Sequence, residues 1–214
     1  MPVYMTEQQN AQRDTEALIL QAAEKEFLEK GYSGAKTTTI AEAAGVTHAM
    51  FHYYFRTKDK LFEKIVADKL GKLMEMMFSA IGNSDLPLKE RIVQGVERHF
   101  DFVAANPLLP RFIFNEVHNR PERLDGIKNN MISMATSLLD NLQSAIDKDA
   151  SINKCRHADA RMVLLDIISL NIFPFVAQPI VNVLLDSIDG NSGSLLEMRK
   201  KENVKTILEK LNIE

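Results

Sequence analysis

Residues 37–60 read TTTIAEAAGVTHAMFHYYFRTKDK, and this stretch decides the fold of the amino-terminal part of the chain. Thr37 is suited to cap a helix that begins at the next residue, because its hydroxyl can accept an unpaired N–H of the first turn. Gly45 follows where a left-handed residue costs least. Thr47 can then cap a second helix that extends through Tyr54. The order of capped helix, tight turn and capped helix predicts a helix-turn-helix, whose second helix enters the DNA major groove.

The second helix of this pair has an inner and an outer side. Met50 and Phe51 are the apolar residues available to face inward. The remaining side chains are expected on the exposed side, and they are His48, Ala49, His52 and Tyr53. A DNA-reading helix needs such an exposed face, because sequence is read by side chains that reach base edges.

The longer stretch IAEAAGVTHAMFHYYFRTKDKLF resembles the DNA-binding signature of the tetracycline-repressor (TetR) family of bacterial transcriptional regulators. The shared pattern is an Ile-Ala pair, an Ala-Gly-Val turn, an aromatic run that ends in Phe, and a Lys before Leu. The resemblance covers Ile19–Leu61 almost throughout and stops near residue 65. The chain departs from the pattern at His52, where the family usually has the first Tyr of a pair.

The resemblance implies which side chains contact DNA. Three threonines precede or begin helices, where hydroxyls and backbone amides can hold phosphates, although as caps they need no DNA. His52 and Tyr53 are suited to donate to phosphates, and His48 and Ala49 to meet base edges or a thymine methyl. Lys58 matches the family lysine that clamps the DNA backbone. The predicted DNA-binding residues are Lys36, Thr37, Thr38, Thr47, His48, Ala49, His52, Tyr53 and Lys58.

The charge of the chain is uneven. The whole sequence has a net charge of −3, but residues 36–60 contain more basic than acidic side chains. A locally positive element on a mildly acidic body suits DNA, since phosphates supply most non-specific affinity. Without the helix-turn-helix pattern, the same excess would indicate only a solvated surface.

Composition indicates an ordinary globular protein. The 214 residues are 45% apolar and 26% charged, and no apolar stretch is long enough to cross a bilayer. The amino-terminal residues are polar and lack the apolar core of a signal peptide. One cysteine, Cys155, excludes an internal disulfide and fits a reducing compartment. These features predict a cytoplasmic protein that does not bind membranes.

Helical spacing recurs along the chain, and no window shows β-type alternation, so we predict an all-α fold of about nine helices. A first helix is expected from about Asp14 to Lys30, where Gly31 stops it. A long helix is expected from about Lys58, because its apolar residues repeat at spacings of three and four: Phe62, Val66, Leu70, Leu73, Met77 and Ile81. A later helix carries the apolar stripe Ile92, Val96, Phe100 and Val103. Pro121 is expected to open another long helix, and the polar stretch 147–155 to form a connection after it. We expect residues 1–60 to form the DNA-binding domain, with 1–12 as a flexible arm. Residues 61–214 are expected to form a helical effector-binding and dimerisation domain.

Catalytic patterns do not emerge from the sequence. It contains no Gly-rich phosphate loop, no nucleophile elbow and no Cys–His arrangement, so neither an enzyme nor a cofactor is predicted. His48 and His52 have the spacing by which two histidines on a helix can share a zinc ion. No Glu follows His48 and no third ligand is evident, so no metal site is predicted.

The carboxy-terminal two-thirds is rich in Met and Phe. Such residues usually form a core, and they also line pockets for apolar ligands. Because the resembled family is one of ligand-sensing switches, we expect an apolar effector pocket near the breaks at Pro174 and Pro179, with His99 as a polar contact. The predicted lining residues are His99, Phe102, Phe112, Met131, Met134 and Phe173.

Dimerisation is expected from the last two long helices. The segment 159–187 is almost entirely apolar, and a helix that is apolar nearly all round must be covered on all sides. In the resembled family these helices form a four-helix bundle with their mates. The predicted interface residues are Leu164, Ile168, Ile207 and Leu211.

These features together predict a DNA-binding transcriptional regulator. In the resembled family such a protein is usually a repressor, which binds a roughly palindromic operator on double-stranded DNA as a homodimer. A small apolar effector is expected to release it. The alternative is a helical interaction module whose helix-turn-helix binds a protein partner. Strongly salt-dependent binding to duplex DNA distinguishes the two.

Overall fold

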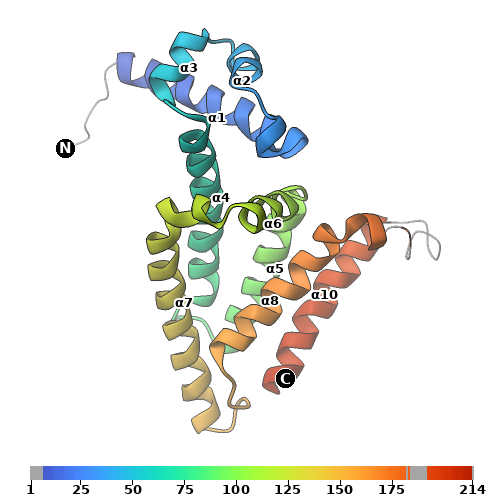
Figure 1. Cartoon of the computed structure of the whole chain (residues 1–214). Coiled ribbons are helices and arrows are strands. Elements are labelled where there is room, and N and C mark those ends of the chain that lie inside the picture. The colour runs from blue at the N-terminus through green and yellow to red at the C-terminus, as the bar shows by residue number, and fades with distance from the viewer. Residues whose placement is uncertain (1–6, 182, 184–191, 214) are drawn as a thin grey trace. The chain divides into compact units, whose positions relative to one another are not determined.

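The computed structural model describes residues 7–181, 183 and 192–213, and these residues contain helices and no β-strand (Figure 1). The predicted all-α fold is therefore confirmed. The helices are α1 (Glu7–Gly34), α2 (Thr37–Ala43), α3 (His48–Tyr54), α4 (Lys58–Ile81), α5 (Leu88–Ala105), α6 (Leu109–Asn119), the 3-10 helix η1 (Pro121–Leu124), α7 (Asp125–Ser151), α8 (Ala160–Val176) and α10 (Ser192–Leu211). Within the described ranges, each helix is too short or too polar to cross a membrane.

The chain divides into two compact units. The first runs to Lys69 and also contains Phe112–Ile127, which come from a distant part of the sequence. The second consists of Leu70–Arg111 and the residues from Lys128 onward. The domain boundary expected between residues 60 and 61 remains a prediction.

The first unit contains the helix-turn-helix. Its α1 begins at Glu7, which is earlier than the expected start near Asp14 and lies within residues 1–12, expected to form a flexible arm. The residues in between contain neither Gly nor Pro, so nothing stops the helix from extending toward the amino terminus; residues 1–6 lie outside the described residues. Gly31 interrupts the helical backbone with a φ of 67°, as expected for a glycine stop. The core is formed by Ile19, Ala23, Phe27, Ile40, Phe51, Leu61 and Phe62.

The turn between α2 and α3 has the predicted chemistry. Gly45 adopts a left-handed φ of 69°, and the Thr47 hydroxyl accepts the backbone N–H of Met50 at 3.2 Å, which confirms this cap. The other predicted cap is wrong, because α2 begins at Thr37 itself and Lys36 holds the cap position. Phe51 is buried, but Met50 is 42% exposed, so its inward placement is also wrong. Adjacent residues of a helix point about 100° apart, and Phe51 alone fills the inner side of this short helix.

The second unit packs α5 against both α8 and α10, which also contact each other (Figure 1). The predicted apolar stripe of α5 is buried, and it consists of Ile92, Val96, Phe100 and Val103. The α4 part of this unit contributes Met77 and Ile81 to the same core. Gly95 lies so close to Ile81 that an added Cβ would stand 2.4 Å from the Ile81 side chain. The absence of a side chain at Gly95 therefore permits this close packing.

Helix boundaries differ from expectation on either side of α7. Pro121 opens a short 3-10 turn, and the α-helix begins at Asp125. The polar stretch after residue 146, expected to be a connection, is helical through Ser151, and it contains Lys148 and Ala150, which are good helix formers. Pro174 lies inside α8, which ends two residues later at Val176, in agreement with the predicted break.

Candidate nucleic-acid interface

The α3 helix presents the face expected of a DNA-reading helix. His48, Ala49 and His52 are exposed, and Tyr53 is 73% exposed. Phe51 is fully buried, so it anchors the helix while its neighbours remain accessible. The face predicted from the sequence is therefore present as a surface.

Two histidines on this face are joined to each other and to α2. The Nε2 atom of His48 lies 3.2 Å from Nε2 of His52 and 3.2 Å from the Thr37 hydroxyl. The buried Phe51 ring flanks both imidazoles, in a parallel arrangement 6.2 Å from His48 and a perpendicular one 5.4 Å from His52. These contacts hold both rings on one side of α3.

Lys58 has a structural role that the sequence analysis did not foresee. Its Nζ donates to the backbone carbonyl of Ala35 at 2.8 Å and lies 4.4 Å from the centre of the Tyr32 ring. The lysine thus ties the start of α4 to the two-residue link between α1 and α2. An ammonium group has three donors, so a phosphate contact by Lys58 remains a prediction.

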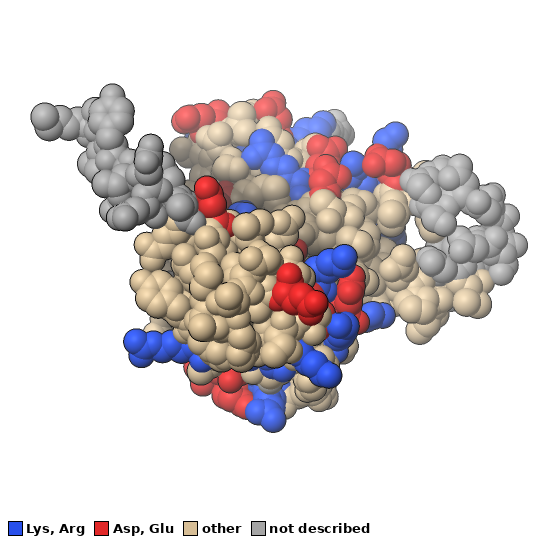
Figure 2. Space-filling view, turned by 90° about the horizontal axis from the view of Figure 1, so that it is seen from above, with Lys and Arg blue, Asp and Glu red and all other residues tan. Residues whose placement is uncertain are grey.

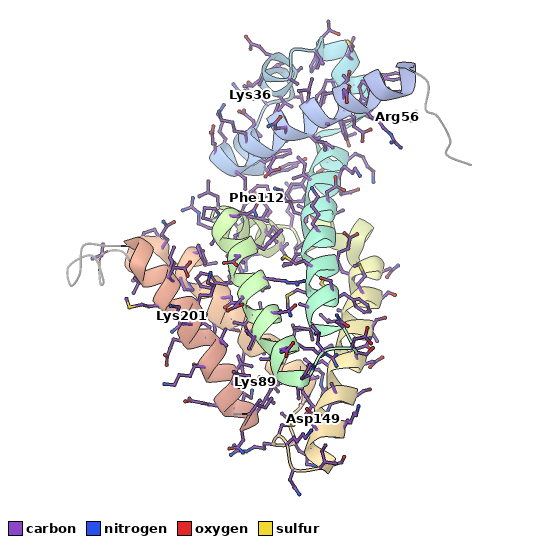
Figure 3. All side chains as sticks on the ribbon, turned by 180° about the vertical axis from the view of Figure 1, so that it is seen from behind. Lys36, Arg56, Lys89, Phe112, Asp149 and Lys201 are labelled. Atoms are coloured by element: carbon purple, nitrogen blue, oxygen red, sulfur yellow. The ribbon has the colours of Figure 1, made fainter. Side chains whose placement is uncertain are left out.

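The other predicted phosphate contacts lie around the helix-turn-helix. Lys36 is exposed at the start of α2, and its backbone N–H donates to the Glu26 carboxylate at 3.3 Å. Glu26 is buried, and the hydrogen bond from Lys30 lowers the pKa of this carboxyl. Arg56, which follows α3, is labelled with Lys36 in Figure 3. In Figure 2 the surface that faces the viewer is mainly uncharged, with both basic and acidic side chains at its margin.

The part of α6 from Phe112 onward belongs to the first unit, and two of its residues contact other parts of this unit. The ring of Phe112 lies 5.6 Å from that of Phe62 and 6.2 Å from that of Phe27. One turn later, Glu116 Oε1 accepts the backbone N–H of Tyr32 at 3.1 Å. Phe112, which was predicted to line an effector pocket, packs in this aromatic core, and its part in a pocket remains a prediction. No local pattern in the sequence indicates such a pairing between segments about 80 residues apart.

The remaining predicted pocket residues lie in the second unit. His99 is 2% exposed, and its Nδ1 lies 3.1 Å from Nδ2 of Asn171. Burial lowers the pKa of His99 to about 4, so the ring is neutral near pH 7. Phe102 packs partly against a buried cluster that includes Phe100, whereas Phe173 is 63% exposed. Met131 and Met134 are half-buried on α7. These side chains therefore do not form one buried cluster, and the pocket remains a prediction.

The predicted dimer residues separate into two groups. Ile207 and Leu211 are fully buried in the core of the chain, and their place in a dimer interface remains a prediction. Leu164 and Ile168 are half-buried on α8. The most exposed apolar side chains of α8 follow a single stripe, and they are Met162, Leu165 and Phe173.

Comparison with known proteins extends these observations. Residues 19–65 match the family described as bacterial regulatory proteins, tetR family. The chain is 31% identical over 99 residues to the HTH-type transcriptional regulator YdgC of Bacillus subtilis (strain 168), a match that covers 45% of this chain and 51% of that protein. It is 27% identical over 88 residues to the fatty acid metabolism regulator protein of the same organism, covering 41% and 45%. The match thus spans about half the length of these relatives.

Solved structures share the fold over nearly the whole chain. The transcriptional regulator FadR from Bacillus subtilis, in complex with stearoyl-CoA, aligns with a TM-score of 0.63 at 19% identity, covering 91% of this chain and 98% of that one. Similarity at this identity concerns the fold alone. Residues 19–65 therefore match the amino-terminal domain of the tetR family of bacterial regulatory proteins, and solved structures described as TetR-family regulators share the helical fold of the chain.

Proposed function

We propose that the protein is a transcriptional regulator that binds a roughly palindromic operator in double-stranded DNA. The observation that carries this proposal is the exposed face of α3, where His48, His52 and Tyr53 are exposed while Phe51 is buried. A short, capped helix of this kind fits the major groove. Its relatives are regulators rather than enzymes, which supports a binding role over catalysis.

Operator binding would use two copies of the chain. Two recognition helices must lie about one DNA turn apart, about 34–36 Å, or a multiple of this distance, to enter successive major grooves. The exposed apolar stripe of α8 supplies a surface for the second copy, since such a stripe is costly to leave in water. We therefore propose Met162, Leu165 and Phe173 as interface residues, together with the half-buried Leu164 and Ile168.

The proposed effector is an apolar molecule, and a long acyl chain is the class that the relatives favour. One relative is named for fatty acid metabolism, and one protein of similar fold was solved with stearoyl-CoA. A ligand weakens DNA binding only if it prefers a conformation that binds DNA less well. The α6 helix is suited to couple effector binding to the helix-turn-helix, because Phe112 and Glu116 contact other residues of the helix-turn-helix unit.

The function is tested by retaining duplex fragments of the protein's own genomic DNA at increasing salt. Enriched fragments that share an inverted repeat, with retention that falls steeply with salt, are expected. Retention that is absent even at low salt would favour the alternative, in which the helix-turn-helix binds a protein partner.

Two lysines separate phosphate contact from a structural role. Lys36→Ala is expected to lower the salt slope of operator binding by about one unit while leaving stability unchanged, because its side chain is exposed. Lys58→Ala is expected to lower the slope and also to reduce the free energy of unfolding by about 1–3 kcal/mol, since it loses the Ala35 and Tyr32 contacts. Operator binding measured at increasing salt gives the salt slope, and urea unfolding gives the stability. If both variants have the same salt slope of operator binding as the parent, the assigned phosphate contacts are contradicted.

Glu116 is expected to couple effector and DNA binding. Glu116→Ala removes the acceptor of the Tyr32 N–H, so the change in operator affinity caused by stearoyl-CoA should shrink about tenfold. Glu116→Gln keeps an amide oxygen in place and should retain most of the response. Glu122→Ala, at an exposed position of η1, is the control. An unchanged response in Glu116→Ala would contradict a role for this bond in coupling.

A further inference from the structure

We propose that His48 and His52 form a chelating site for a divalent transition-metal ion on the exposed face of α3. Their Nε2 atoms are 3.2 Å apart and belong to side chains one helical turn from each other. Zinc binds imidazole nitrogens at about 2.0–2.1 Å in tetrahedral geometry, which separates two ligating nitrogens by about 3.3 Å. The two nitrogens are thus at chelating distance, and the rings, which are perpendicular with centres 4.4 Å apart, would turn to point both Nε2 lone pairs at one ion.

The surrounding residues hold the rings in this arrangement. Phe51 is fully buried and flanks both imidazoles, so the rings rest against a fixed apolar surface. The hydroxyl of Thr37 lies 3.2 Å from Nε2 of His48 and adds a contact from α2. Both histidines are exposed, so an ion in solution can reach them.

The site would use two ligands from the protein. Within the described residues, His, Cys, Asp and Glu side chains do not gather in any group of three or more that could hold a metal. Water is expected to complete the coordination, which differs from the four protein ligands of a structural zinc site. The ion should therefore bind and leave without unfolding the chain.

A bound ion changes what α3 offers to DNA. Coordination uses the Nε2 lone pairs of both histidines, and these nitrogens are then unavailable to base edges or phosphates. We infer that zinc competes with the operator for this face. This second step rests on the proposed DNA-binding function, whereas metal binding itself does not.

Metal binding is tested by calorimetric titration of the full chain, prepared without a histidine tag, with zinc chloride. One ion per chain is expected. Each variant, His48→Gln or His52→Gln, leaves one imidazole ligand in place of two. Zinc binding should therefore weaken roughly hundredfold in each. His118→Gln removes an exposed histidine elsewhere and is the matched control. If either the His48 or the His52 variant binds zinc as tightly as the parent, the proposed site is wrong. It is also wrong if the parent does not bind zinc.

Competition is tested separately by operator retention with zinc and after addition of a chelator. Zinc should lower retention of the parent and of His118→Gln, and the chelator should restore it. Retention by His52→Gln, measured relative to its own metal-free value, should not respond to zinc. If zinc binds the parent at the expected stoichiometry but leaves its retention unchanged, the inferred competition is wrong. A parent that retains no DNA under any condition would instead contradict the proposed function.

Discussion

A chain in which alanine replaces Phe27 is expected to lose about 3–5 kcal/mol of unfolding free energy and, with it, DNA binding. Phe27 is fully buried, and its ring lies 5.8 Å from Tyr32, 6.0 Å from Phe62 and 6.2 Å from Phe112. Removing the ring leaves a cavity where α1, α4 and α6 meet. Native domains have unfolding free energies of only about 5–15 kcal/mol, so this loss would leave the first unit only marginally stable.

The matched control is Leu18→Ala, which truncates an exposed leucine of the same helix. Its stability should stay within about 0.5 kcal/mol of the parent, because surface truncations leave no cavity. Urea unfolding followed by circular dichroism measures both variants. A Phe27→Ala chain with the unfolding midpoint of the parent would show that the aromatic cluster does not hold the unit together.

Leu165→Asp is expected to separate the proposed homodimer into monomers and to lower operator affinity by about 10²–10⁴-fold, since the second recognition helix no longer binds in the same complex. Leu165 is 53% exposed and lies between Met162 and Phe173 on the stripe. A carboxylate at this position would lose its hydration against an apolar partner surface, which is unfavourable. Sedimentation at micromolar concentration measures the association state.

An equally exposed apolar residue outside the stripe supplies the control. Ile132 lies on α7, and Ile132→Asp is expected to remain dimeric and to bind the operator like the parent. A dimeric Leu165→Asp chain would exclude this face of α8 as the interface. A monomeric Ile132→Asp chain would instead indicate that α7 takes part in association.

The sequence predicted the features that depend on neighbouring residues. The Thr47 cap, the left-handed Gly45 and the buried stripe of α5 each follow from residues within a turn or two of one another. The contacts of Glu26 and Phe112 join segments that are not adjacent in the sequence, and no local spacing reports them. Burial of a carboxylate at Glu26 also runs against the usual preference of that residue for the surface.

The predicted interface residues show a second limit of prediction from sequence. The α8 segment is apolar nearly all round, so periodicity could not distinguish the side that faces its own core from the side that faces solvent. In α10, Ile207 and Leu211 share the inward stripe, and the apolar signal there reports packing within one subunit. Only the burial of each side chain shows that Leu165 and Phe173 are the accessible ones.

The two-residue link Ala35–Lys36 is held from both sides, because Glu26 of α1 accepts its N–H and Lys58 of α4 donates to its carbonyl. The start of α2 is thereby fixed by helices that precede and follow the helix-turn-helix. An excised peptide of residues 37–60 lacks Glu26 and the link, and helices of seven residues are too short to persist alone. The stability of the helix-turn-helix should consequently depend on α1 and α4, so a fragment must contain both helices to hold α2 and α3 in place.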